Sequence, residues 1–292
     1  SHRERYTSGL HPFGSVCRLR YGAGGRDACR DKKYLRKYRE DSDFDIDIPE
    51  FKNMGYWFKP RVILLLSVIK REIQQIEYKD IRDFVFAAFS ETIRFVSNRR
   101  NGEFKMFRMP VNKVDQFEPD VIKEFMTILN RNIEKMKDFD AACSKTGETS
   151  AVTIFKDNAM TLEDVPDDSV DLVVTSPPYG DSRTTVAYGE YSRLSLQWID
   201  LFHLSEKEIM GIDKSLMGGN KYKNGFECNI LSSTLKASLQ RIQEADLARA
   251  GDVYSFYLDL SRAIAAVSRK TKVGGYQFWV VGNRRVKGEL LL

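Results

Sequence analysis

The sequence predicts an α/β fold with a doubly wound, mostly parallel sheet. Short apolar segments that read as strands alternate with longer amphipathic segments that read as helices. The strands are expected at 151–155, 170–176 and 276–283, the last entered through Gly274 and Gly275, and the helices at 191–202 and 252–270. A chain of 292 residues with 42% hydrophobic residues is also large enough to bury a full α/β core.

Residues 51–145 form a different region with a helical pattern. Apolar residues recur at helical spacing from Pro60 to Ile76 and again from Ile81 to Thr92. A third amphipathic helix is expected from Pro119 to Lys137, with Pro119 in the first turn. The apolar stripes of these helices predict a helical core, inserted before a catalytic core at 146–292.

Residues 1–50 carry little hydrophobic periodicity. The segment is rich in glycine at 21–25 and then highly charged, which is typical of a loop followed by a solvated helix or disorder. The four cysteines, Cys17, Cys29, Cys143 and Cys228, form no C-x-x-C pair and have no histidines at metal-ligand spacing. The sequence therefore predicts no metal site.

Composition bears on partners and location. The formal charge of +5 and the pI near 8.9 suit a polyanionic partner. No apolar run reaches the length of a membrane span, and no signal-peptide pattern opens the chain. We expect a cytoplasmic protein with reduced thiols and no membrane partner.

A basic segment with interleaved aromatics lies between the second and third helices. Cations can neutralise phosphates while aromatic faces stack on bases, so the segment is a candidate DNA contact. The alternative is a solvated hairpin whose aromatics point into the core. The candidate residues are Arg99, Arg100, Lys105 and Arg108, with Phe104 and Phe107 between them.

Two prolines end the strand at 170–176 in an unusual way. A residue before proline is held extended, and neither Pro177 nor Pro178 can donate to a neighbouring strand. The result is a rigid rim of acceptors, formed by the Ser176 hydroxyl and the carbonyls of Ser176 and Pro177, beside the flat ring of Tyr179. This arrangement suits a planar ring that bears an amino group. In doubly wound sheets, ligands bind at this end of the strands.

The segment "TSPPY" at the end of an apolar strand resembles motif IV of the DNA amino-methyltransferases, and 170–198 resembles the restriction–modification type. The similarity extends over about 50–292, through "GYWFKP" and "VVGNRRVKG". It implies a Rossmann-like class I fold that uses S-adenosylmethionine, in a bacterial or archaeal protein. The implied partners are double-stranded DNA and a cognate restriction endonuclease.

The resemblance also implies a mechanism. The N–H groups of a flipped-out base would bind Ser176 and the Pro177 carbonyl, with Tyr179 as the stacking platform. A serine before the two prolines goes with cytosine N4 more often than with adenine N6 in this family. A cytosine-C5 enzyme would need a cysteine nucleophile after a proline, and no cysteine of this chain follows one, which argues against that class. Adenine N6, a catalytically inactive DNA-binding paralogue and a methyltransferase for RNA or a protein amide stay open as alternatives.

Cofactor residues follow from the resemblance as well. Asp157 stands where the family places an acidic residue against the cofactor adenine, with Asn158 and Ala159 beside it and Thr175 at the strand end. A helix-capping aspartate is the alternative for Asp157.

The remaining cofactor elements of the family are expected in the first 50 residues. The family's glycine-rich loop has no recognisable counterpart, so either the chain is a degenerate member or natural segments are missing from it. The substitutes are His11, Pro12 and Phe13 in "GLHPFGS", then "YGAGG" at 21–25, and Asp45 or Asp47 for the ribose.

Overall fold

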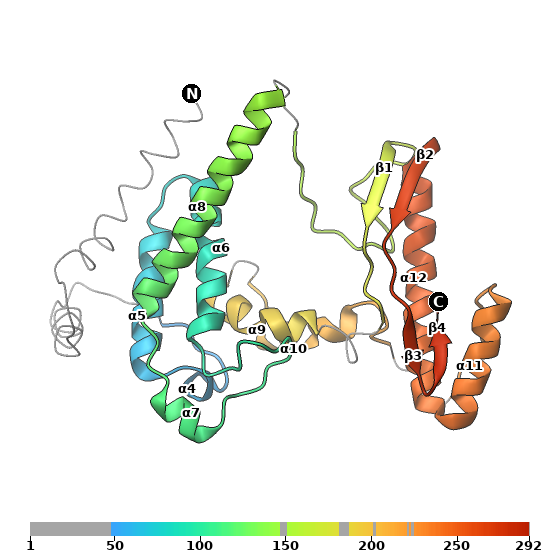
Figure 1. Ribbon diagram of the computed structural model, residues 1–292, viewed down its shortest axis with the longest axis horizontal. Helices are drawn as coiled ribbons and strands as arrows, with labels where there is room; N and C mark the ends of the chain where they lie inside the picture. Colours follow the sequence, from blue (N-terminus) through green and yellow to red (C-terminus); the bar gives the residue numbers. More distant parts are fainter. Residues whose placement is uncertain are drawn as a thin grey trace, which may run out of the picture. The chain divides into compact units, whose positions relative to one another are not determined.

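The protein divides into two compact units (Figure 1). The computed structural model describes residues 48–146, 151–180, 187–200, 203–220, 222 and 225–291. Ser1–Thr149 with Ser192–Glu206 form one unit, which we call the helical unit. Ser150–Tyr191 with Lys207–Leu292 form the other, which we call the sheet unit.

The three predicted helices of the helical unit are confirmed. The described helices of this part are α4 (Met54–Trp57), α5 (Pro60–Gln74), α6 (Lys79–Val96), α7 (Val111–Gln116) and α8 (Val121–Thr146). α5 begins at Pro60, which fits the first turn because its missing N–H has no helical acceptor there. The expected start of α8 at Pro119 is wrong. The Oδ1 atom of Asp120 accepts the backbone N–H of Lys123 at 3.0 Å, so Asp120 caps the helix instead.

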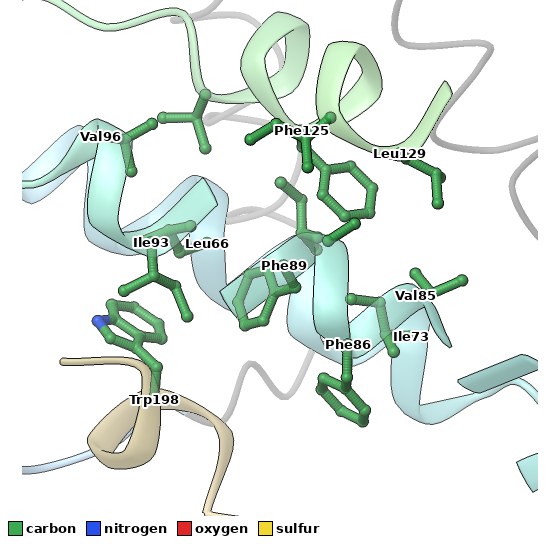
Figure 2. Close-up of a cluster of buried hydrophobic side chains, with 14 of the residues drawn as sticks. Leu66, Ile73, Val85, Phe86, Phe89, Ile93, Val96, Phe125, Leu129 and Trp198 are labelled. Atoms are coloured by element: carbon green, nitrogen blue, oxygen red, sulfur yellow. The ribbon is translucent and has the colours of Figure 1, made fainter. Parts of the chain in front are cut away.

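The apolar faces of α5, α6 and α8 pack into one core (Figure 2). Leu66, Phe89 and Phe125 are each fully buried in it. Trp198 of α9 (Tyr188–Ile199) is also fully buried here, with its ring centroid 5.5 Å from that of Phe58. The sequence assigned this tryptophan to the catalytic core, but its large apolar ring is buried with the helical unit.

The sheet unit contains a parallel pair of strands. β1 (Val170–Thr175) pairs with β2 (Thr271–Trp279), and α12 (Leu247–Lys270) leads directly into β2. The register runs to Thr175↔Trp279, so both strands end at the same edge. α10 (Glu206–Ser215), α11 (Ser233–Ala245) and an antiparallel hairpin of β3 (Arg284–Val286) and β4 (Glu289–Leu291) complete the described elements of this unit.

Some of the predicted strands and helices agree with the structure, and others do not. The strand expected at 170–176 is confirmed as β1, and the helix expected at 252–270 is confirmed within α12. The helix expected at 191–202 corresponds to α9, which begins at Tyr188 and ends at Ile199. The strand expected at 151–155 is wrong: these residues have no regular structure, and Ile154 is 91% exposed. Gly274 and Gly275 lie inside β2, where the register with β1 is irregular, and not before it. The described residues are thus mixed α/β with parallel strands, and the larger doubly wound sheet stays a prediction.

One face of the β1–β2 pair is open to solvent. Leu172 is 54% exposed, Val174 is 70% exposed and Phe278 is 58% exposed. Strands of a doubly wound sheet are usually buried on both faces, so the exposure of β1 among the described residues departs from what that fold class leads one to expect. α12 packs against β2, but these side chains remain outside that contact.

The sequence predicted neither a membrane-spanning helix nor a metal site. No helix among them is both long and apolar enough to cross a membrane. Within the same residues, no group of His, Cys, Asp and Glu side chains is arranged to hold a metal ion. Of the two described cysteines, Cys143 is exposed and Cys228 is half-buried.

Candidate active site

The rim of acceptors lies at the carboxyl end of β1, beside the end of β2. The backbone N–H of Val280 donates to the Thr175 carbonyl at 2.9 Å, which continues the pairing one residue beyond β2. Pro177 and Pro178 follow, and neither has an N–H to continue the ladder. The chain therefore leaves the sheet at Ser176, at the end of the strand where ligands of open parallel sheets bind.

A hydrogen bond joins the two side chains of the rim. The Ser176 Oγ and Tyr179 Oη atoms are 3.2 Å apart, and either can donate. Both residues are exposed, Tyr179 to 45%. When Ser176 donates to Tyr179, the lone pairs of its oxygen remain available to accept from an N–H group of a ligand. The tyrosine thereby fixes the direction in which Ser176 accepts.

Gly282 supports the ring of Tyr179 from behind. A Cβ atom built on Gly282 would lie 3.0 Å from Cδ2 and 3.1 Å from Cγ of that ring. Such a contact is tighter than most Cβ contacts, so any other residue at this position would have to displace the ring by a few tenths of an ångström. The sequence pattern did not single out this residue. The available signal was a glycine directly after an apolar strand.

A cavity of about 640 Å³ adjoins the rim. It brings three of the predicted cofactor residues, Asp157, Asn158 and Ala159, together with Pro178 of the rim. The remaining lining residues, which the sequence did not predict, are Lys156, Met160, Gly180, Tyr188, Ser215, Leu216 and Met217. The cavity is within the range of sizes that small-molecule ligands occupy.

Asp157 organises the loop that carries it. Its Oδ1 atom accepts the N–H of Asn158 at 2.6 Å, and its Oδ2 atom accepts the N–H of Asp164 at 3.1 Å. The aspartate therefore caps a turn, and not a helix as the alternative interpretation held. A carboxylate has about four lone-pair positions, so two remain available to a ligand in the cavity.

Other predicted cofactor residues do not meet at this cavity. Thr175 is not among its lining residues, and its carbonyl accepts from Val280. His11, Pro12 and Phe13 lie outside the described residues, as do the glycines at 21–25, Asp45 and Asp47.

The basic segment forms a hairpin in the helical unit. Arg99 and Arg108 face each other in an antiparallel bridge, and the Arg100 N–H donates to the Phe107 carbonyl at 2.8 Å. Arg99 is only 1% exposed, and its guanidinium donates to the Glu103 carbonyl. A phosphate could not reach this side chain without a local rearrangement, so the structure does not favour Arg99 as a DNA contact.

The rest of the hairpin faces solvent. Phe104 is 60% exposed and Phe107 is 49% exposed, so these rings do not point into the core as the alternative required. Arg100 is exposed, while the Arg108 guanidinium lies 4.3 Å from the Tyr56 ring centroid. Lys105 is half-buried. The hairpin thus presents aromatic faces and cations on one exposed loop.

Comparison with known proteins found a methyltransferase that is similar to this chain. Over 247 residues, or 82% of this chain, the sequence is 42% identical to the type II methyltransferase M.MvaI of Kocuria varians. The chain is homologous to a type II methyltransferase. It spans 54% of the length of that relative. No family model matches the chain, and no solved structure matches it.

Proposed function

We propose that the protein is a site-specific DNA amino-methyltransferase of the restriction–modification type. It would transfer a methyl group from S-adenosylmethionine to the exocyclic amine of a flipped-out base. The observation that carries the proposal is the rim at the end of β1, where the Ser176 hydroxyl is hydrogen-bonded to Tyr179 beside a ligand-sized cavity. The similarity to a type II methyltransferase supports the same reaction class.

The rim would act by positioning the amine. Ser176 Oγ and the Pro177 carbonyl each accept one N–H group, which favours a nitrogen whose lone pair points away from both acceptors. An aromatic amine is a weak nucleophile, so orientation and preorganised acceptors supply the catalysis in place of a covalent step. Tyr179 stacks on the base, which must leave the duplex to reach this rim.

The cavity fits the cofactor in size and in chemistry. Asp157 and the loop around it offer acceptors for an amino or hydroxyl group, and Pro178, Leu216 and Met217 offer apolar walls for a ring. S-adenosylmethionine would supply an electrophilic methyl group when bound. Further cofactor contacts are proposed for Thr175 and for His11, Pro12 and Phe13.

The preferred base is cytosine at N4, with adenine N6 as the alternative. The preference depends on Ser176, because a serine before the two prolines favours cytosine by resemblance to the family. Both bases present an amine with two donors beside a ring nitrogen, so the rim accepts either one chemically.

Double-stranded DNA is the proposed substrate, with a cognate restriction endonuclease as a second partner. The hairpin of the helical unit would contribute phosphate contacts through Arg100, Lys105 and Arg108. The exposed rings of Phe104 and Phe107 give it a further means to contact unpaired bases.

The test is methyl transfer to duplex DNA by the protein in its full natural length. Ser176→Ala and Tyr179→Ala are compared with Ser169→Ala, which removes an exposed hydroxyl at the opposite end of β1. We expect each rim variant to lose roughly 10²–10³-fold in kcat, the range for removal of one preorganised hydrogen-bonding group. The control should retain wild-type turnover.

Mass analysis of nucleosides from the methylated DNA identifies the product. N4-methylcytosine supports the preferred base, whereas methyladenine as the sole product contradicts it. Wild-type turnover in either rim variant would reject the mechanism. A wild type that binds DNA and cofactor without any transfer would favour the inactive paralogue.

A further inference from the structure

A second hollow in the sheet unit is lined almost entirely by cations. It measures about 440 Å³ and is lined by Arg249, Arg284, Arg285, Val286 and Lys287. Four of these five side chains are positively charged and none is acidic. Two of the four, Arg249 and Lys287, are paired with aspartates outside the lining, and the positive charge that remains favours an anionic ligand over a neutral one.

Local contacts hold several of these cations in place. Arg249 pairs with Asp252 at 3.2 Å, and its side chain is only 15% exposed. Lys287 pairs with Asp246 at 3.0 Å, and Asp246 also caps α12. The pKa of Asp246 is lowered, first by the hydrogen bond that the backbone N–H of Arg249 donates to it and then by the hydrogen bond from Lys287. The carboxylate therefore stays ionised and keeps Lys287 at the hollow.

Arg285 is the most accessible of the guanidinium groups. Its residue is exposed, and its Nη1 atom lies 3.4 Å from the Gly288 carbonyl, which is at the limit of a hydrogen bond. A planar guanidinium can offer two parallel N–H donors to one phosphate group. Arg285 can turn its donors toward a ligand at little cost in existing bonds.

The hollow adjoins the rim through Arg284. A Cβ atom built on Gly180 would lie 1.6 Å from Nη1 of Arg284, so this guanidinium occupies the space beside the residue that follows Tyr179. Gly282, which supports the Tyr179 ring, is two residues before Arg284 in the chain. Arg284, one of the four cations of the hollow, therefore lies next to Gly180, the residue that follows the proposed stacking platform Tyr179.

We propose that Arg249, Arg284, Arg285 and Lys287 bind the phosphodiester backbone of the DNA strand that carries the target base. The inference rests on the proposed function and extends it by assigning a phosphate site beside the rim. A base that leaves the duplex carries its flanking phosphates with it, and contacts to these phosphates hold the extruded nucleotide in register. A hollow with four cations suits the closely spaced charges of a backbone better than a single carboxylate.

The experiment measures binding of a fluorescein-labelled duplex of mixed sequence to the full-length protein at several salt concentrations. The variant is Arg285→Gln with Lys287→Gln. The control is Lys272→Gln, at the amino end of β2 and therefore away from the rim. The slope of log K against log salt should become less steep by about 0.9 for each phosphate that the variant no longer neutralises. The control should keep the wild-type slope.

Charge-conserving changes separate binding from folding. Arg285→Lys with Lys287→Arg should restore most of the slope, which a merely structural role of the original side chains would not predict. The KM for DNA in the Gln variant should rise by a larger factor than kcat falls. Equal slopes for the wild type and the Gln variant would overturn the proposal.

Two further results would distinguish the phosphate site from the proposed function. Calorimetry with S-adenosylmethionine tests the cofactor carboxylate as the anion: weaker cofactor binding with an unchanged salt slope would overturn the DNA assignment. Methyl transfer by the wild type is measured on the same duplex preparation and on bacterial plasmid DNA. Absence of transfer would reject the proposed function, while the salt slopes would still decide the phosphate site.

Discussion

The helical unit and the sheet unit differ in how far they bury large apolar side chains. In the helical unit the stripes of α5, α6 and α8 meet in one core, where Phe89, Phe125 and Trp198 are fully buried. In the sheet unit Leu172, Val174 and Phe278 stay exposed on one face of β1–β2. A buried large side chain contributes about 1.5–3 kcal/mol, so the two units depend on apolar burial to different degrees.

Near the candidate active site, the sheet unit is held together by polar contacts, unlike the apolar core of the helical unit. A smaller apolar cluster joins α11, α12 and the β3–β4 hairpin, with the rings of Phe226 and Tyr254 stacked at 4.3 Å. At the rim, the Ser176 hydroxyl is hydrogen-bonded to the Tyr179 hydroxyl, and Gly282 approaches the Tyr179 ring closely. We therefore expect core substitutions to change stability in the helical unit, and small changes near the rim to affect turnover.

The largest effect is expected at Trp198. Trp198→Ala should lower the free energy of unfolding by about 3–5 kcal/mol, because it leaves a large cavity among Phe51, Phe58 and Phe89. Denaturant unfolding followed by circular dichroism measures the change. Phe139→Ala is the control, since Phe139 is 63% exposed on α8. A loss below about 1 kcal/mol would contradict a core role for the tryptophan.

Gly282→Ala should reduce turnover with little loss of stability. The added Cβ would displace the Tyr179 ring by a few tenths of an ångström, and we expect a decrease in kcat of roughly tenfold, because reacting groups tolerate small displacements poorly. Fluorescence of a duplex with 2-aminopurine at the target position reports stacking on the tyrosine. Gly211→Ala, with no heavy atom within 4 Å of its Cβ, is the control. Identical kcat and fluorescence would show that Gly282 has no positioning role.

A smaller effect is expected at the ion pair before β1. Lys270 lies 2.7 Å from Asp167, and this hydrogen bond lowers the pKa of the aspartate below its ordinary value of 3.8. Because the pKa is lower in the folded state, the stabilisation is complete well above pH 4 and is lost as the pH falls through the folded pKa. A double-mutant cycle of Asp167→Asn and Lys270→Gln, repeated at several pH values, measures it. A coupling energy that grows on acidification would have the wrong sign.

The smallest effect is expected on the exposed face of the sheet. Leu172→Thr with Val174→Thr should change the free energy of unfolding by no more than about 0.5 kcal/mol for each substitution, as is usual for surface positions. Thermal and denaturant unfolding of the full-length protein measure the change. A loss of several kcal/mol would break the comparison between the units, because it would mean that the face is buried in the natural protein.

The local sequence was sufficient to predict the helices and strands that depend on patterns within a few residues. The 3.6-residue period and Pro60 predicted the helices of the helical unit, and the β-formers before Pro177 predicted β1 and its end near the prolines. These predictions succeeded because periodicity and the missing proline N–H act within a few residues. The same reasoning failed at 151–155, where an apolar run pairs with no strand among the described residues and has no regular structure.

Only the tertiary structure decided which distant residues meet. Gly282 lies against Tyr179 although 103 positions separate them in the chain, and Trp198 is buried with α5 and α6 of the helical unit. Arg99 and Arg100 are adjacent in sequence, yet one is buried and the other exposed. Residue type and spacing carry no record of such contacts, because burial and close backbone approach depend on how the elements pack together.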